Sequence, residues 1–261
     1  MNKRLLFHLV EISPWPFIGS VGGFGLVLGK ILWWHNSILF LLQLSIIIVL
    51  LTMVFWWFDV IREKMQGYHN SIVSRGLRMG MLYFILSEGF FFFRFFWAFF
   101  HKCWGPQSEI GYIWPPYLFN TILIDPFSIP LLKTVILLSS GIRITWSHFG
   151  ILSSNKYYFS FGLVLTILLG YVFLVLQYGE YVNRKFKITR TVYGTVFFIL
   201  TGFHGLHVII GFIFLFICFI RLFYFHFSKN LHIGFEAASW YWHFVDVVWL
   251  FLYIFIYWYC S

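Results

Sequence analysis

The run Thr201-Gly-Phe-His-Gly-Leu-His-Val-Ile-Ile-Gly211 lies inside an apolar stretch, Tyr193–Ile220, and a second such stretch, Gly234–Tyr257, follows it. A membrane-spanning helix needs about 20 apolar residues at a rise of about 1.5 Å each, so both stretches are long enough to cross a bilayer. Each carries ionisable side chains near its middle, where a charge that faces lipid costs several kcal/mol. We therefore expect five side chains to face protein, water or a cofactor: His204, His207, Glu236, His243 and Asp246.

Composition places the whole chain in the membrane. Of its 261 residues, 61% are hydrophobic and 10% are charged, whereas soluble domains have about 25% charged residues. No internal repeat or low-complexity segment divides the chain, so we predict an all-α integral membrane protein that forms one domain, residues 1–261. Seven segments are long and apolar enough to be spans, at about 15–34, 38–58, 78–100, 128–149, 158–178, 191–220 and 234–258.

The basic residues favour contact with a membrane surface over nucleic-acid binding. The net charge is +9, but most Lys and Arg residues lie between apolar runs, where anionic lipid headgroups supply the counter-charge. Nine of them fall on the N-terminal side of a seven-span topology and seven on the other, so the positive-inside rule favours an N-terminus on the inner side. The 36 Phe residues and three Ala residues are typical of an AT-rich genome and predict organelle encoding.

The pair His204-x-x-His207 places two imidazoles on one helical face, a pattern that can bind haem, copper or zinc. The sequence offers no matching pair on a second helix, and His243 lies roughly 8–12 Å away in depth at about 1.5 Å per residue. The cysteines, Cys103, Cys218 and Cys260, are too far apart in the sequence to suggest a disulfide framework or a thiolate site. We therefore favour packing histidines over metal ligands.

Carboxylates in the last span suggest either a proton relay or a set of structural pairs. Glu236, Trp240 and His243 share a helical face, and Asp246 lies one turn beyond His243. An unpaired buried charge is too costly to persist, so we favour partners within the protein. The sequence then predicts an internally satisfied polar seam between packed helices, made of His204, His207, Glu236, His243 and Asp246.

Glu88 is a further intramembrane acid. It lies about ten residues into the apolar segment Leu77–Phe100, roughly 15 Å deep, and phenylalanines surround it in the sequence. Burial among apolar side chains favours the neutral, protonated carboxyl, and an intramembrane carboxyl is by default a functional candidate. Arg94, six residues later, is off the i, i+3/i+4 face of Glu88, so the sequence predicts no pairing between the two.

Another group of residues suits phospholipid headgroups. Interfacial tryptophans are followed by basic residues, and in a seven-span topology all of them lie on the same side of the membrane. Basic groups between helices suit lipid phosphates, and an ordinary solvated loop is the alternative that the residues leave open. The group comprises Trp56, Trp57, Arg62, Lys64, His69, Arg221 and His226.

These residues closely resemble subunit III of the mitochondrial cytochrome c oxidase family, over nearly the whole chain. Besides the Thr201–Gly211 run and the last span, the matching motifs are Ser13-Pro-Trp-Pro16, Asp59-Val-Ile-Arg-Glu63, Ser87-Glu88, Phe95-Phe-Trp-Ala-Phe99 and Trp114-Pro-Pro116. The resemblance implies seven transmembrane helices in two bundles, a two-helix hairpin at about 1–70 and a five-helix bundle at 71–261. A lipid-filled V-shaped cleft would separate the bundles.

The resemblance also implies a role. Members of the family hold no haem or copper, bind structural phospholipids, and pack in the mitochondrial inner membrane against the haem-copper subunit I. That complex oxidises cytochrome c, reduces O2 to water and pumps protons. Glu88 matches the family's buried, carbodiimide-reactive carboxyl, for which a proton role is suggested. The positions that match the family's lipid sites are Trp56, Trp57, Arg62, Glu63, His69, Arg221 and His226.

We therefore predict a non-catalytic, lipid-binding core subunit of such an oxidase, which supports assembly, stability and proton uptake and has its N-terminus on the matrix side. Three alternatives fit less well. A quinol oxidase subunit III typically has five spans, and the predicted hairpin Trp15–Phe58 argues against it. A haem-bearing electron carrier would use His204 and His207. A stand-alone transporter would use Glu88 as its proton site.

Overall fold

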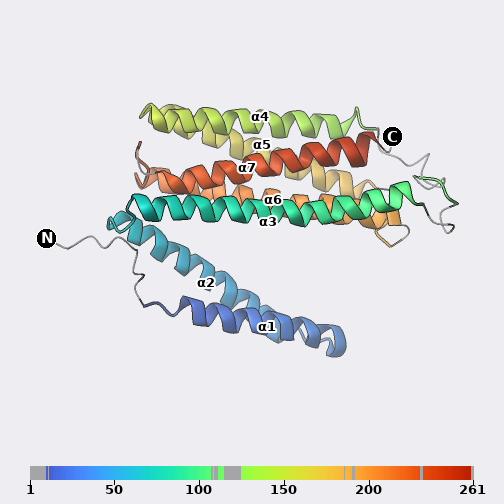
Figure 1. The fold of residues 1–261 in the computed structure, drawn as a ribbon, viewed down its shortest axis with the longest axis horizontal. Coiled ribbons are helices and arrows are strands. Elements are labelled where there is room, and N and C mark those ends of the chain that lie inside the picture. The colour runs from blue at the N-terminus through green and yellow to red at the C-terminus, as the bar shows by residue number, and fades with distance from the viewer. Residues whose placement is uncertain are drawn as a thin grey trace. The chain divides into compact units, whose positions relative to one another are not determined.

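The part of the chain that the structure describes contains seven α-helices (Figure 1). The structure is a computed structural model, and it describes residues 10, 12–106, 108, 111–114, 125–184, 186–189, 192–229 and 232–259. The helices are α1 (Trp15–Asn36), α2 (Phe40–Met65), α3 (Ser71–Trp104), α4 (Ile129–Leu152), α5 (Lys156–Val182), α6 (Val192–Phe223) and α7 (Ile233–Leu252), which the π-helical segment η3 (Tyr253–Trp258) continues. All seven are long and apolar enough to cross a membrane, and the described ranges contain no β-strand. The predicted all-α membrane fold is confirmed.

The helices extend beyond the apolar segments that predicted them. α3 runs for 34 residues, from Ser71 to Trp104, whereas hydropathy marked only residues 78–100. At about 1.5 Å per residue this helix is roughly 50 Å long, which exceeds the ~30 Å hydrocarbon core. The backbone hydrogen bonds continue into the polar flanks because a helix needs residues of adequate propensity and not apolar ones. Hydropathy therefore locates the membrane core of a helix and underestimates its length.

The chain divides into two compact units, Met1–Leu77 and Arg78–Ser261, which we call the N-terminal and the C-terminal unit. The first contains α1 and α2, and the second contains α4 to α7. α3 begins in the first unit and continues in the second. One membrane domain over residues 1–261 and a lipid-filled cleft within it stay predictions.

In the N-terminal unit, α1 and α2 form a tight helical hairpin. Ser37 turns the chain with a left-handed φ of 57°, and its N–H donates to the carbonyl oxygen of Trp33 at 3.1 Å. Gly29 permits the close approach of the two helices, because a Cβ at this position would lie 2.6 Å from the backbone nitrogen of Leu42. The absence of a side chain at Gly29 thus allows α1 and α2 to pack closely.

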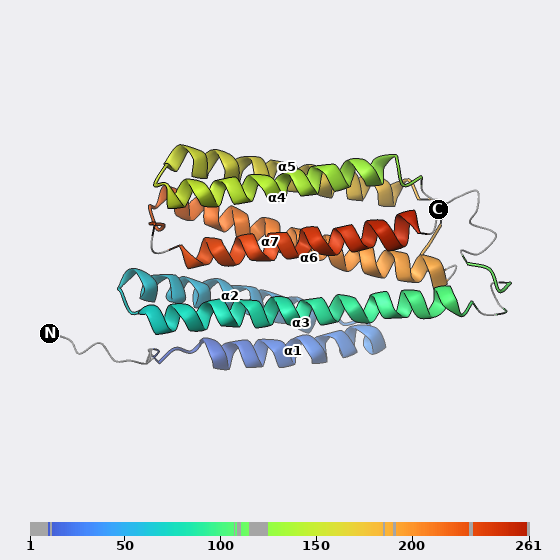
Figure 2. The same ribbon diagram turned by 45° about the horizontal axis from the view of Figure 1, so that its top comes forward.

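α7 is central to the C-terminal unit, where it contacts both α4 and α6 (Figure 2). Its tryptophans, Trp242 and Trp249, are completely buried. Each donates its indole N–H to α4, Trp242 to Oγ of Ser140 at 2.8 Å and Trp249 to Oγ1 of Thr134 at 3.0 Å. A buried indole needs such a partner. These bonds fix the rotation of α7 and so decide which of its polar side chains meet α3, α4 and α6.

Candidate functional site

Glu88 on α3 and His207 on α6 form a hydrogen-bonded pair in the C-terminal unit. Oε2 of Glu88 lies 2.9 Å from Nε2 of His207. Nδ1 of His207 lies 2.7 Å from the carbonyl oxygen of Phe203, which can only accept, so Nδ1 carries a hydrogen. The contact between Glu88 and His207 therefore holds one proton, which resides either on the carboxyl group or on an imidazolium.

Aromatic rings enclose most of this pair. The centroid of the His207 ring lies 5.0 Å from that of Phe92 and 6.3 Å from that of Tyr241. By excluding water, these aromatic rings strengthen the hydrogen bond between Glu88 and His207. The Glu88 side chain keeps 24% of its surface exposed, against 7% for His207. Glu88 is thus partly rather than fully buried by this chain, and the sequence did not indicate His207 as its partner.

His204 has a different partner from His207. Its Nε2 lies 3.2 Å from the carbonyl oxygen of Val245 on α7, and its ring packs against Phe173 and Trp249. Both nitrogens of His207 are engaged elsewhere, so the two imidazoles do not converge on a common ligand. This arrangement agrees with packing histidines and disfavours the haem-bearing alternative.

His243 and Asp246 lie on α7 next to α4. Nδ1 of His243 lies 3.8 Å from Oδ2 of Asp246, and its Nε2 lies 3.3 Å from Oγ1 of Thr145. Asp246 is only 5% exposed, and its Oδ1 has no hydrogen-bond partner among the described residues. A buried oxygen of this kind costs free energy until a proton or another donor satisfies it.

The residues predicted as one polar seam therefore occupy separate contacts. Glu236 pairs with Arg78 on α3, where its Oε2 lies 2.7 Å from Nε of the arginine. Glu236 and His243 share a face of α7, but seven residues separate them by about 10 Å along the axis, too far for a direct contact. The five residues thus make local contacts, some with a neighbouring helix and one, between His243 and Asp246, within α7. A single internally satisfied seam stays a prediction.

Four of the predicted lipid-binding residues line one pocket of the N-terminal unit. The pocket has a volume of about 280 Å³. Trp57 is not part of its lining, and its ring is exposed instead. The four predicted residues in the lining are Trp56, Arg62, Glu63 and His69.

The acidic side chains of this pocket already have partners. Asp59 accepts a hydrogen bond from Nε1 of Trp15 at 2.5 Å, and Oε2 of Glu63 lies 4.0 Å from Nε2 of His69. Arg62 forms no ion pair with any residue that the structure describes. A guanidinium carries five N–H donors in a planar fork that matches a phosphate, so the pocket can take an anionic headgroup.

The other predicted lipid-binding residues, Arg221 and His226, belong to the C-terminal unit. The Arg221 guanidinium stacks over Phe227 at 4.7 Å from the ring centroid. It also lies so close to Gly234 that a Cβ there would come within 2.6 Å of a guanidinium nitrogen. Its buried Nε has no hydrogen-bond partner within the described ranges. The residues predicted to bind lipid thus fall into two separate sets.

The sequence analysis missed a buried ionic network in the C-terminal unit. Lys133 on α4 is fully buried, and its Nζ donates to Oε1 of Gln177 at 2.7 Å and to Glu180. Glu180 also pairs with Arg184 and accepts a hydrogen bond from the hydroxyl of Tyr257 at 2.8 Å. The available signal was the position of Lys133 inside the predicted span 128–149. A lysine inside a span needs a partner within the protein.

Comparison with known proteins gives a consistent result. A family model described as cytochrome c oxidase subunit III matches residues 5–261. The chain is 53% identical over 256 residues to the cytochrome c oxidase subunit 3 of Heterololigo bleekeri, with 98% of each chain covered. It is 54% identical over 262 residues to the protein of the same name from Patiria pectinifera, with both chains covered completely. The protein of that name from Anopheles quadrimaculatus is 54% identical over 256 residues, which cover 98% of this chain and 97% of that one.

Proposed function

The chain belongs to the cytochrome c oxidase subunit III family, and we propose that it acts as a non-catalytic, lipid-binding core subunit of the oxidase. The family expected from the sequence is confirmed by the match over residues 5–261. The oxidase complex transfers electrons from cytochrome c to O2 and pumps protons, and this chain would support its assembly, stability and proton uptake. A quinol oxidase subunit III is less consistent, since the family model and the matched relatives carry the cytochrome c oxidase name.

On this proposal, the redox centres belong to other subunits. The chain would lie in the mitochondrial inner membrane with its N-terminus on the matrix side and would pack against the haem-copper subunit I. The contacts of the two histidines support the assignment of the redox centres to other subunits. Both ring nitrogens of His207 lie in hydrogen bonds, and Nε2 of His204 points at a carbonyl oxygen, so neither atom set is directed at a haem iron.

The pocket beside Arg62 carries the lipid-binding part of the proposal. It combines a cation that has no carboxylate partner within the described residues with the indole of Trp56 and with apolar side chains such as Val60 and Leu77. A phospholipid at the membrane interface presents a phosphate beside acyl chains, which matches this combination. The partners of Asp59 and Glu63 reduce the repulsion that these acids would exert on a phosphate.

The experiment compares Arg62→Gln with Arg75→Gln in the assembled oxidase. Arg75 is an exposed arginine of the same unit that does not line the pocket, so it controls for the loss of one positive charge. Mass spectrometry of lipids that survive detergent purification should show one phospholipid fewer per complex for Arg62→Gln. Equal lipid retention in the wild type and both variants would refute the site.

The Glu88–His207 pair supports the proton-related part of the proposal. A carboxyl and an imidazole that share one proton across 2.9 Å can exchange it between two atoms with little motion of either helix. Glu88 keeps 24% of its side-chain surface exposed in this chain, so the carboxyl is not closed off from groups outside it. Glu88→Gln, which removes the acid and keeps the contact with His207, tests this part of the proposal.

A further inference from the structure

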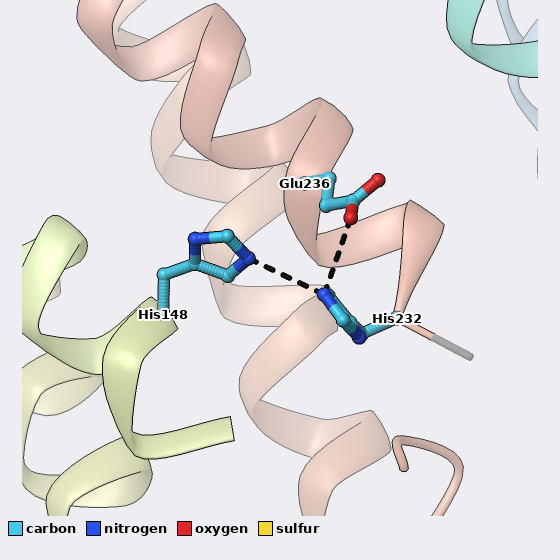
Figure 3. Close-up of side chains that lie close together, drawn as sticks. All are labelled: His148, His232 and Glu236. Carbon is cyan, nitrogen blue, oxygen red and sulfur yellow. Dashed lines mark hydrogen bonds and ion pairs between the residues drawn. The ribbon is translucent and has the colours of Figure 1, made fainter. Parts of the chain in front are cut away.

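His148, His232 and Glu236 form a cluster that the proposed function does not use (Figure 3). His148 lies four residues before the end of α4, His232 directly precedes α7, and Glu236 lies in the first turn of α7. Nε2 of His148 lies 3.3 Å from Nε2 of His232, which in turn lies 3.2 Å from Oε1 of Glu236. All three ligand atoms lie within 4.8 Å of one another. Three elements of the C-terminal unit thus direct lone-pair-bearing atoms at one point.

The hydrogen bonds around His232 call for either a proton or a metal ion at this point. Nδ1 of His232 lies 3.1 Å from the carbonyl oxygen of Ser228, which can only accept, so Nδ1 carries a hydrogen. In a neutral ring Nε2 then presents a lone pair to the carboxylate oxygen of Glu236, only 3.2 Å away. Two lone pairs at that distance repel each other unless a proton or a metal ion lies between them.

The distances fit a zinc-like ion. Two imidazole nitrogens and one carboxylate oxygen are a ligand set that Zn²⁺ commonly takes, with a fourth position left for water. Bonds of about 2.0–2.1 Å in a tetrahedral arrangement place neighbouring ligand atoms roughly 3.3–3.4 Å apart. The observed separations of 3.3 Å and 3.2 Å match that spacing. The third separation, between Nε2 of His148 and the Glu236 carboxylate, is within 4.8 Å.

Outer partners hold two of the three ligands in position. The Ser228 carbonyl oxygen orients the His232 ring, and Arg78 holds the Glu236 carboxylate through Nε at 2.7 Å and Nη2 at 3.2 Å. Metal-binding histidines and carboxylates usually have such hydrogen-bonded supports. Arg78 is itself a cation on this carboxylate, so it fixes the position of Glu236 and at the same time competes with a divalent ion for its negative charge. His232 is only 6% exposed, so its ring is shielded from solvent.

We propose that His148, His232 and Glu236 form a binding site for one divalent transition-metal ion of the Zn²⁺ class. It lies at the end of the C-terminal unit where α4 ends and α7 begins. The occupant that competes with a metal is a proton on Nε2 of His232, and the experiment separates the two.

The experiment measures zinc binding to the assembled oxidase. Complexes stripped with a chelator are dialysed against ⁶⁵Zn²⁺, and bound zinc is counted per haem so that sites in other subunits cancel between variants. His148→Ala and His232→Ala should each bind one equivalent less than the wild type. The double variant should also lose one equivalent and not two, because the two residues serve one ion. His101→Ala, which removes an exposed histidine from the end of α3, should bind as much zinc as the wild type.

A structure of the zinc-loaded wild-type complex tests the proposal without any variant. Metal density should lie about 2.0–2.1 Å from the two Nε2 atoms and from Oε1 of Glu236. Equal zinc binding by the wild type and His148→Ala, or a zinc-loaded structure with no metal between these atoms, would overturn the proposal and assign the cluster to a proton.

Discussion

Oε2 of Glu88 and Nε2 of His207 lie 2.9 Å apart, although 119 residues separate the two in the sequence. Glu88 lies 17 residues after the start of α3, and His207 lies 16 residues before the end of α6. In a seven-span topology those two helix ends fall on the same side of the membrane. At about 1.5 Å per residue both side chains therefore sit roughly 24–26 Å from that end. The pair joins two helices at one depth.

Glu88→Gln should keep this contact while removing the acid. The amide can donate a hydrogen to Nε2 of neutral His207, so the free energy of unfolding should change by less than about 1 kcal/mol. Carbodiimide attacks protonated carboxyl groups, so it should label wild-type Glu88 and leave the variant unlabelled at this position, as read by peptide mass spectrometry. Wild-type Glu88 that stays unlabelled would contradict the assignment.

Arg221→Ala should release a bound phospholipid and shorten the turnover lifetime of the oxidase. The change removes the stacked guanidinium and its buried Nε, which has no hydrogen-bond partner within the described ranges. Arg143→Ala is the matched control, because Arg143 also lies over an aromatic ring, 5.9 Å from that of Trp146. Lipid analysis and repeated-turnover assays make the comparison. Unchanged lipid content and lifetime in Arg221→Ala would argue against a headgroup at this arginine.

Gly29→Ala should destabilise the hairpin of the N-terminal unit by about 1–3 kcal/mol, because the new Cβ would lie 2.6 Å from the backbone of Leu42. Gly23→Ala is the control on the same helix. Nothing lies within 4 Å of a Cβ at Gly23, so that change should be neutral or slightly stabilising through helix propensity. Thermal denaturation of the purified complex measures the difference in stability between the two variants. Equal unfolding midpoints would show that α1 and α2 can move apart at Gly29 without loss of stability.

Glu180→Gln should be among the most damaging single changes in the C-terminal unit. It would leave the fully buried Lys133 and the neighbouring Arg184 without their shared carboxylate. Removing one partner of a buried ion pair costs about 3–5 kcal/mol. Combining it with Lys133→Met should recover part of that loss, since the uncompensated lysine is removed as well. Assembly yield and thermal stability report both effects, and a double variant less stable than Glu180→Gln would contradict this account.

Most of the fold could be predicted from the sequence. Length and hydropathy are local properties, so the seven spans follow from them, as does the helical rather than β architecture, since unpaired backbone groups are intolerable in lipid. The ends of the helices cannot be predicted from hydropathy in the same way. The 34 residues of α3 exceed its apolar core because polar residues such as Arg75 and Lys102 continue the helix without contributing to hydropathy.

Partners on other helices could not be predicted from the sequence as readily as the side chains that need them. The pocket of the N-terminal unit is lined by Trp56, Arg62 and Glu63 near the end of α2 and by His69 in the connection that follows it, all close together in the sequence. His148 was missed as a partner of His232 and Glu236, because it comes from a helix 84 residues earlier in the chain.

Seven spans, a resemblance to the subunit III family, and the need of the intramembrane acids and histidines for partners within the protein all follow from the sequence alone. Length and hydropathy predict the spans, the matching motifs carry the resemblance to the family, and the cost of a charge in lipid predicts the need for partners. Only the tertiary structure decided that Glu88 meets His207, that Lys133 meets Glu180, and that Glu236 meets Arg78 and His232. The reason is physical. Spacing along a helix gives the face and depth of a side chain, but the packing of large residues such as Trp242 and Trp249 sets the rotation of each helix and therefore the neighbour that the side chain finds.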